Sequence, residues 1–156
     1  EIEIGKKPPA FTLEDSDGNK VSLRSLAGKD VILYFYPRDN TPGCTVEAQG
    51  FAKLWRKIAA RGAVVVGVSP DSSTSHAEFA SKYKLPFTLL SDPDKKVMTK
   101  YGAFGDKVMY GKKTQGVIRS TVWIGRNGKV VKHWPRVTKT ADHPAAVLAE
   151  LNEQGA

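Results

Sequence analysis

Cys44 is the only cysteine in this 156-residue sequence, and its neighbours favour a reactive thiolate. Thr41 and Pro42 precede it, and these residue types are typical of the N-cap and the first position of a helix. Cys44 would then lie in the first helical turn, where unpaired backbone N–H groups and the helix dipole stabilise negative charge. Because the thiolate is the nucleophilic form of cysteine, we identify Cys44 as the candidate nucleophile.

Two elements must position this cysteine. Residues 31–36 form a continuous apolar run, rich in β-branched and aromatic side chains, which predicts a strand buried on both faces and ending at Pro37. The helix that begins at Pro42 is expected to continue through residues 46–61, which carry apolar side chains at helical spacing. Cys44 is therefore expected at the junction of a central strand and the helix that follows it.

The remaining chain alternates predicted strands and helices. Strands are expected at residues 11–14, 20–23, 63–69, 87–90, 121–124 and 130–134, with Asp17–Gly18 and Asn127–Gly128 as hairpin turns. Helices are expected at residues 75–83 and 95–101 and after residue 142, whereas residues 102–116, with several glycines and lysines, predict a loop. This order indicates an α/β architecture in one domain spanning residues 1–156.

Composition and charge exclude several classes of protein. The chain is 40% hydrophobic and 26% charged, as is ordinary for a globular protein, and no apolar run is long enough to cross a bilayer. The net charge of +8 comes from scattered basic residues without a nucleic-acid-binding module, so no nucleic acid partner is expected. Without a visible signal peptide we expect a cytoplasmic protein. The chain begins with Glu1 and not with Met, so a cleaved leader upstream stays an alternative.

The segment around Cys44 closely resembles the active-site motif of peroxiredoxins. It reads Tyr36-Pro-Arg-Asp-Asn-Thr-Pro-Gly-Cys-Thr-Val-Glu47, and its Thr-Pro-Gly-Cys-Thr core resembles the bacterioferritin-comigratory, or peroxiredoxin Q, subfamily. Further segments resemble that subfamily in the same order: Gly67-Val-Ser-Pro-Asp71, Ser75-His-Ala-Glu-Phe79, Leu85-Pro-Phe-Thr-Leu-Leu-Ser-Asp92, Tyr101-Gly102, Met109-Tyr-Gly-Lys112 and Arg119-Ser-Thr121. The resemblance implies a thioredoxin-like fold, with a central mixed sheet flanked by helices and an N-terminal β-hairpin extension.

The resemblance also implies a thiol-dependent peroxidase with four active-site positions. In such an enzyme a thiolate attacks one peroxide oxygen while negative charge grows on the departing oxygen, so two anions need stabilising. Cys44 would be the nucleophile, Thr41 would supply a hydroxyl, Arg119 a cation with forked donors, and Pro37 would shield the site from water.

Two further residues are candidates for substrate binding. Backbone donors near Gly43 would face the peroxide at the helix N-terminus. Glu47 also matches the subfamily, but an acid in the first turn suits the helix dipole equally well, so both roles stay open. We predict no metal site, because three separated histidines and one cysteine lack the spacing of metal ligands.

The sequence departs from the subfamily at the resolving position. Many members carry a second cysteine five residues after the nucleophile, where this chain has Gln49, which we interpret as a natural residue. A one-cysteine cycle follows, in which an external thiol such as thioredoxin or glutaredoxin with glutathione reduces the sulfenic acid. The subfamily suggests a monomer, with a dimer as the alternative, and hydrogen peroxide or organic hydroperoxides as substrates.

Other functions remain as alternatives. A lone cysteine at a helix start also suits a Cys-His hydrolase or acyltransferase, with His76, His133 or His143 as the base. A thioredoxin-like disulfide reductase is disfavoured, because the Cys-x-x-Cys motif is absent. A non-enzymatic binding or holdase module, in which Cys44 has no chemical role, is the third alternative.

Overall fold

A seven-stranded mixed sheet forms the centre of the molecule. The structure, a computed structural model, describes residues 2–154, apart from the side chain of Met109. The strand order is β2-β1-β5-β4-β3-β8-β9, in which β3–β4 and β4–β5 are parallel pairs and the other pairs are antiparallel. The strands are β1 (Thr12–Glu14), β2 (Lys20–Ser22), β3 (Asp30–Phe35), β4 (Ala63–Ser69), β5 (Thr88–Ser91), β8 (Ser120–Ile124) and β9 (Val130–Trp134).

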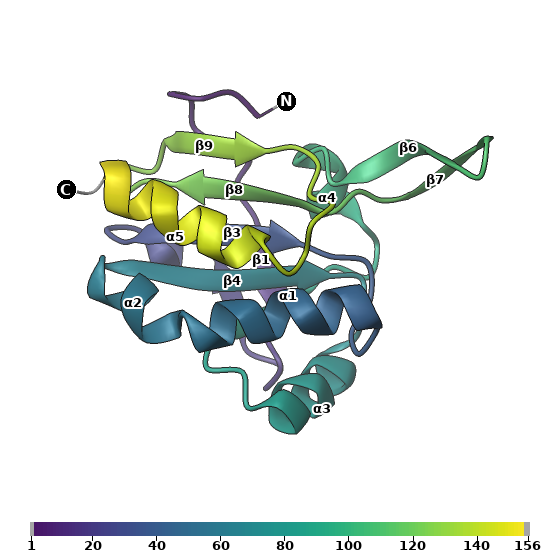
Figure 1. The fold of residues 1–156 in the computed structure, drawn as a ribbon, viewed down its shortest axis with the longest axis horizontal. Coiled ribbons are helices and arrows are strands. Elements are labelled where there is room, and N and C mark those ends of the chain that lie inside the picture. Colours follow the sequence, from purple (N-terminus) through teal and green to yellow (C-terminus); the bar gives the residue numbers. More distant parts are fainter. Residues whose placement is uncertain (1, 155–156) are drawn as a thin grey trace.

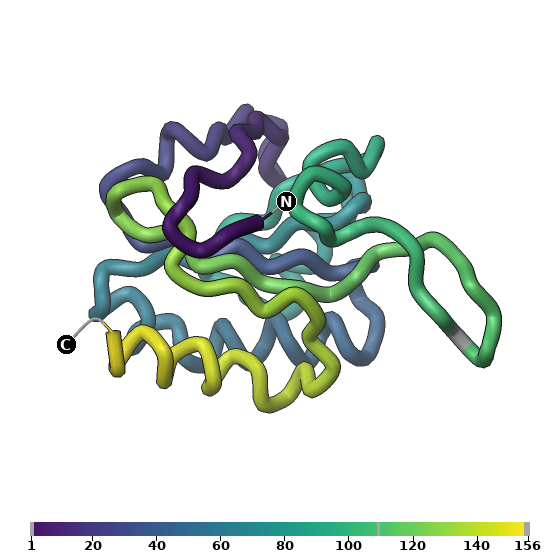
Figure 2. Tube along the Cα trace, turned by 90° about the horizontal axis from the view of Figure 1, so that it is seen from above, coloured from purple at the N-terminus to yellow at the C-terminus, as the bar shows by residue number. Residues whose placement is uncertain are grey.

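Helices cover both faces of this sheet (Figure 1). On one side lie α1 (Pro42–Lys53), α2 (Trp55–Ala60) and α5 (His143–Gln154), and Figure 2 shows α1 and α5 running along the same side of the sheet. Helix α3 (Ser73–Tyr83) packs into the same core through Phe79, whereas α4 (Lys96–Lys100) and the 3-10 helix η1 (Leu23–Leu26) pack into the core on the opposite face. This arrangement confirms the predicted mixed sheet flanked by helices, with an N-terminal β-hairpin at its edge. Within residues 2–154, no helix combines the length and apolarity that a bilayer crossing requires.

Strand β3 contributes to both hydrophobic cores, as its uninterrupted apolar run predicted. Val31, Leu33 and Phe35 pack into the core on the α4 side. Ile32 and Tyr34 alternate with them and, with Tyr36, join the core under α1, α2 and α5. Because successive side chains of a strand point to opposite faces, a strand covered on both sides must be apolar at every position. Because β3 is packed on both faces, the position of its C-terminal end, from which the chain continues to α1, is fixed.

The predicted helix start is confirmed, but its predicted continuity to residue 61 is wrong. Helix α1 begins at Pro42, with Cys44 in its first turn, and Leu54 separates it from α2, which starts at Trp55. The backbone of Leu54 has φ −95° and ψ 4°, outside the regular helical range, although its N–H still donates to the carbonyl of Gly50.

The predicted loop over residues 102–116 is also wrong, because it forms a two-stranded ribbon. Strands β6 (Phe104–Met109) and β7 (Lys112–Val117) pair antiparallel and project from the body of the molecule (Figure 1). Tyr110 and Gly111 connect them with φ of 53° and 76°, the signs that a type I′ hairpin turn requires. The ribbon is largely exposed, so its sequence lacks the apolar alternation by which a half-buried strand is detected.

Candidate active site

Cys44 lies in the first turn of α1, directly beyond the end of β3. Its side chain is buried, with only 1% of its surface exposed. The N–H groups of Gly43 and Cys44 have no hydrogen-bond acceptor within residues 2–154, as is normal for the first turn of a helix. These free donors and the positive end of the helix dipole therefore surround the sulfur with positive potential.

Arg119 contacts the sulfur directly. Its Nη2 donates to Cys44 Sγ at 3.3 Å, although the two residues are 75 positions apart in the sequence. Strand register explains the encounter: β8 pairs with β3 so that Ser120 lies opposite Phe35. Arg119, one residue before β8, is therefore level with the end of β3. The predicted meeting of Arg119 with Cys44 is present in the structure.

Glu47 completes this arrangement from the next turn of α1. Its Oε1 accepts a hydrogen bond from Arg119 Nη1 at 2.7 Å, and its side chain is fully buried. Burial raises the pKa of Glu47 to about 7, and the opposing effect of Arg119 does not cancel this rise. Its second oxygen, Oε2, has no hydrogen-bond partner within the described residues. Near neutral pH this carboxyl group can therefore take or release a proton close to the sulfur.

Pro37 and Arg119, the residue that contacts the sulfur, together line a cavity of about 250 Å³. The other lining residues come from the β6–β7 ribbon and from the segments next to β8 and β9, and they include Lys107 and Arg136. We call this space the cationic cavity; its lining among the described side chains is Pro37, Lys107, Val108, Val117, Ile118, Arg119, Arg136 and Thr138. Pro37 thus shares a cavity wall with Arg119, whereas its role in shielding the approach to Cys44 stays a prediction.

Thr41 and Gly43 occupy the N-terminus of α1, as predicted, but the hydroxyl of Thr41 does not cap the helix. Thr41 is the N-cap residue by backbone conformation, whereas its Oγ1 donates to the carbonyl of Arg38 at 2.9 Å. Its hydroxyl has no hydrogen bond to the sulfur within residues 2–154. A β-carbon at Gly43 would lie 3.4 Å from Arg119 Nη2, so glycine lets the guanidinium lie close to the helix.

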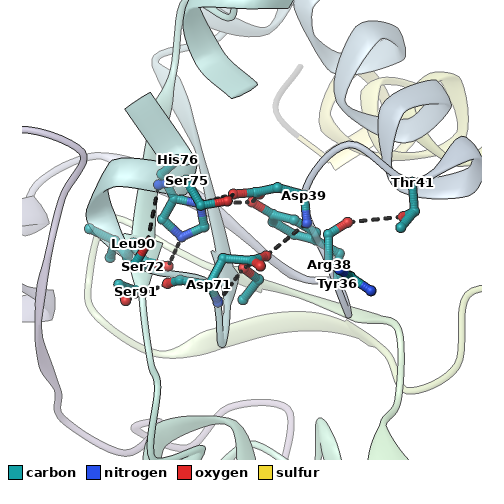
Figure 3. A network of polar contacts seen from close by, with 11 residues as sticks. Tyr36, Arg38, Asp39, Thr41, Asp71, Ser72, Ser75, His76, Leu90 and Ser91 are labelled. Atoms are coloured by element: carbon teal, nitrogen blue, oxygen red, sulfur yellow. Dashed lines mark hydrogen bonds and ion pairs between the residues drawn. The ribbon is translucent and has the colours of Figure 1, made fainter. Parts of the chain in front are cut away.

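A second buried polar cluster holds the loop between β3 and α1 (Figure 3). Asp39 accepts from Tyr36 Oη at 2.5 Å, from Ser75 Oγ at 2.8 Å and meets His76 Nδ1 at 2.7 Å. The other ring nitrogen of His76, Nε2, lies 2.9 Å from the carbonyl oxygen of Leu90. Because a carbonyl can only accept, Nε2 is the donor in this contact.

Asp71 extends this cluster to the end of β4. Its Oδ2 accepts from the backbone N–H of Asp39 at 2.7 Å and from Ser69 Oγ at 2.7 Å. We call Asp39, Asp71 and His76 the loop anchor. Their possible ligand atoms lie within 4.8 Å of one another, but each already takes part in the hydrogen bonds just described. The geometry is therefore that of a structural network which pins the loop before Cys44.

Sequence reasoning missed the loop anchor. One signal was available: His76 lies one helical turn before Phe79 on α3, and both side chains are buried. A histidine on the apolar face of a helix needs partners for both ring nitrogens, which suggests a nearby carboxylate. The identity of that carboxylate depends on how the loop folds back onto α3, and local sequence does not determine this.

The three histidines give no support to Cys-His acyl transfer. His143 Nε2 lies 2.8 Å from Thr121 Oγ1, and burial, helped by Arg119, lowers the pKa of His143 to about 4. His76 belongs to the loop anchor, and burial lowers the pKa of His133. In the described part of the chain, the side-chain hydrogen bond of the sulfur is to Arg119 and none is to a histidine.

Comparisons with known proteins agree with this geometry. The model of the AhpC/TSA family matches residues 4–133. The Bcp protein of Coxiella burnetii is 49% identical over 150 residues, which cover 96% of this chain and 99% of that protein. Peroxiredoxin Bcp of Bacillus subtilis is 41% identical over 152 residues, or 97% and 96% of the two chains. A solved structure of the bacterioferritin comigratory protein of Xanthomonas campestris aligns with a TM-score of 0.90 at 37% identity, covering 99% and 100%. The predicted thioredoxin-like fold is thereby confirmed.

Proposed function

Because this chain belongs to the AhpC/TSA family and is a thiol peroxidase of the Bcp, or peroxiredoxin Q, type, we propose that Cys44 is its peroxide-reducing nucleophile. The observation that carries this assignment is the 3.3 Å contact between Arg119 Nη2 and Cys44 Sγ at the N-terminus of α1. A guanidinium and free backbone donors around one sulfur favour its anionic, nucleophilic form.

The proposed reaction transfers one oxygen atom to the sulfur. The Cys44 thiolate attacks the terminal peroxide oxygen, the O–O bond breaks, and the departing alkoxide or hydroxide takes a proton to leave as alcohol or water. The sulfur is oxidised to a sulfenic acid and the peroxide is reduced. Arg119 and the N–H groups of Gly43 and Cys44 would stabilise charge on both the attacking and departing atoms. Pro37 would exclude water from the approach.

Thr41 and Glu47 have supporting roles in this proposal. The Thr41 hydroxyl lies at the start of α1 and would turn from the Arg38 carbonyl toward a bound peroxide. Glu47 holds the guanidinium of Arg119 through Nη1, which leaves Nη2 directed at the sulfur. Its exchangeable proton near pH 7 gives the site a local acid for the departing oxygen.

An external thiol completes the cycle, because the sequence contains no second cysteine. A peroxiredoxin requires a thiol reductant, and a one-cysteine enzyme must obtain it from another molecule. Gln49, at the position of the resolving cysteine in many relatives, is exposed on α1. We propose that reduction passes through a mixed disulfide between Cys44 and this external thiol, which is thioredoxin, glutaredoxin with glutathione, or a similar compound.

The substrate range and cellular setting are also proposals. The Xanthomonas campestris relative is described by its alkyl peroxide reduction activity, which supports organic hydroperoxides in addition to hydrogen peroxide. We further propose that residues 1–156 form one domain and that the protein acts in the cytoplasm as a monomer, with a dimer as the alternative. Neither nucleic acid nor membrane is a proposed partner.

One experiment tests the assignment of Cys44. Peroxide consumption in the presence of a thiol is measured for the wild type and for Cys44→Ser, and the substitution is expected to abolish it. Equal rates would favour the binding or holdase alternative. Mass spectrometry after one equivalent of peroxide should show a monomer sixteen mass units heavier, or a thiol adduct if thiol is present. A monomer two mass units lighter would contradict the one-cysteine cycle.

A further inference from the structure

We propose that the cationic cavity selects the reductant, and that this reductant is a low-molecular-weight thiol carrying carboxylate groups. The inference rests on the proposed function, because it concerns the thiol that reduces oxidised Cys44. Arg119 lines the cavity and its Nη2 also lies 3.3 Å from Cys44 Sγ, so a molecule bound there would contact the residue that touches the atom it must attack.

Charge is the first argument for an anionic occupant. Lys107, Arg119 and Arg136 contribute three cations to the lining of the cavity, and none of the described residues that line it is acidic. Within the described residues Arg119 is paired with Glu47, whereas neither Lys107 nor Arg136 forms a salt bridge. The ammonium of Lys107 instead donates to the carbonyl of Val117 at 3.1 Å. Two cations at the mouth of the cavity are therefore free to pair with carboxylates.

The nearest acidic side chain on the ribbon does not cancel this charge. Asp106 precedes Lys107 on β6, but its Oδ2 is 3.5 Å from Lys113 Nζ, and both of these side chains are mostly exposed. The residues of β6 that line the cavity are Lys107 and Val108, and Asp106 is not one of them. The contribution of β6 to the cavity is therefore one cation and one apolar side chain.

Access to the sulfur is the second argument, and it favours a small molecule. Cys44 is 1% exposed in a fully formed helical turn, so a thiol on the surface of another protein would need this turn to open. A cavity of about 250 Å³ is large enough to hold a small thiol against Arg119, the residue that contacts the sulfur. Its remaining walls, Pro37, Val108, Val117 and Ile118, suit the aliphatic part of such a molecule.

The proposed step is balanced in atoms and electrons. The thiol sulfur attacks the sulfenic sulfur of Cys44, an S–S bond forms, the S–O bond breaks, and hydroxide leaves with a proton as water. A second thiol molecule then attacks the mixed disulfide, which releases the disulfide of the small thiol and restores Cys44. Carboxylates held by Lys107 and Arg136 would orient the first thiol toward the sulfur.

The test measures reduction of pre-formed Cys44 sulfenic acid by thiols that differ in charge. Glutathione and N-acetylcysteine are the anionic probes, 2-mercaptoethanol is neutral and cysteamine is cationic, each compared at equal thiolate concentration. We expect the wild type to favour the anionic over the neutral thiols by about fivefold or more at low salt. The double variant Lys107→Glu with Arg136→Glu should lose this preference or invert it.

A matched control separates the cavity from the overall charge of the molecule. Arg56→Glu with Lys57→Glu makes the same change in net charge on α2 and should keep the preference. Arg136→Glu alone is the second test variant, since it leaves the hydrogen bond of Lys107 to the ribbon intact. An unchanged preference in both cavity variants, or an equal loss in the control, would overturn the proposal.

A carboxylate-bearing hydroperoxide would share the same binding chemistry, and a separate arm distinguishes it. Oxidation of reduced Cys44 is compared for an anionic hydroperoxide and its methyl ester, in the wild type and in the cavity variants. If the cavity variants lose only the preference for the anionic peroxide, the cavity binds substrate and not reductant, which overturns the proposal. Failure of the proposed function is different, since peroxide consumption would then not depend on Cys44 at all.

Discussion

Two buried charged clusters lie on either side of the loop between β3 and α1, and they differ in how completely their polar atoms are satisfied. In the loop anchor, each carboxylate oxygen and ring nitrogen of Asp39 and His76 has a partner. In the sulfur site, which we define as Cys44, Glu47 and Arg119, Glu47 Oε2 has none among the described residues.

This difference indicates that the loop anchor has a structural role and that the sulfur site has a chemical one. A fully satisfied buried network fixes one conformation, whereas an unpaired buried oxygen costs free energy that folding alone does not explain. Glu47 is linked to the sulfur through Arg119, which contacts both, so its spare oxygen belongs to the group of residues where the peroxide must react. We therefore expect changes in the sulfur site to alter rates, and changes in the loop anchor to alter stability.

The largest effect is expected at Arg119. Replacing Arg119 with Met removes the donor at 3.3 Å from the sulfur and should lower the second-order rate constant with hydrogen peroxide about 10²- to 10³-fold. Stopped-flow measurement of sulfenic acid formation at pH 7 checks this. Arg119→Lys keeps the charge without the forked donors and should lose less. A rate for Arg119→Met within threefold of the wild type would refute the assignment of this residue.

The loop anchor should respond in the opposite way. His76→Ala leaves the buried Asp39 carboxylate without its partner at 2.7 Å and should lower the free energy of unfolding by about 3 kcal/mol. The rate with peroxide, measured under conditions where the variant is folded, should change less than fivefold. Urea denaturation gives the stability. His133→Ala is the control, because His133 is only partly buried and its Nε2 has no partner in the described residues.

A combined result would break the comparison between the two clusters. If the folded His76→Ala variant reacted with peroxide a hundredfold more slowly than the wild type, the loop anchor would contribute to the reaction itself. If its stability were unchanged, the hydrogen bonds of His76 would have no net structural value.

Glu47 should make the stability of the protein depend on pH. Burial raises its pKa from 4.5 in the unfolded chain to about 7, so the folded state binds the proton more tightly. The free energy of unfolding is therefore highest, as far as this group is concerned, below pH 4.5, and it falls as the pH rises to about 7. The fall is on the order of 3 kcal/mol for a shift of this size.

Glu47→Gln removes this titration and should flatten the pH dependence. Urea denaturation at pH 5 and pH 8 should show that the wild type loses about 2–3 kcal/mol relative to the variant. Glu78→Gln, at an exposed position on α3, should leave the curve of the wild type unchanged. Parallel curves for the wild type and Glu47→Gln would show that burial does not raise the pKa of this carboxyl group.

The smallest effects come from two stacked tyrosines on β3 and its extension. The rings of Tyr34 and Tyr36 are 5.4 Å apart. Tyr36 Oη donates to Asp39 and lies 3.4 Å from His76 Nδ1, whereas Tyr34 Oη has no hydrogen-bond partner within residues 2–154. Tyr36→Phe should cost about 1–2 kcal/mol, whereas Tyr34→Phe should cost nothing or stabilise slightly, since it removes an unsatisfied buried hydroxyl. Thermal or urea unfolding of both variants measures the difference. If Tyr34→Phe lowered the free energy of unfolding more than Tyr36→Phe does, the link between satisfied hydrogen bonds and stability would be wrong.

The central fold could be predicted because its signals are local. A few consecutive residues are enough to predict β3 and β4 from their apolar runs and the last hairpin from its Asn127–Gly128 turn. The β6–β7 ribbon could not be predicted in this way, because a free ribbon has no buried face and its Tyr110–Gly111 turn lacks the usual Asn-Gly signal. The break at Leu54 has no Gly or Pro to mark it.

The site divides in the same way. Cys44 follows from its position at a helix start, but the contact with Arg119 depends on the register between β3 and β8. Family resemblance supplied what local pattern lacked at that residue. Asp39 had no such help, because its role depends on the folding of an irregular loop against α3. Long-range pairings of single polar side chains are therefore what remained out of reach.

The solitary sulfhydryl has one practical consequence for anyone handling this protein. A denatured sample that is titrated with a colorimetric thiol reagent reports the reduced fraction of the active site directly, since no other residue reacts. One equivalent per chain means that every molecule is competent. Any shortfall equals the share lost to oxidation during purification or storage, and recovery after treatment with a reductant separates reversible from permanent damage.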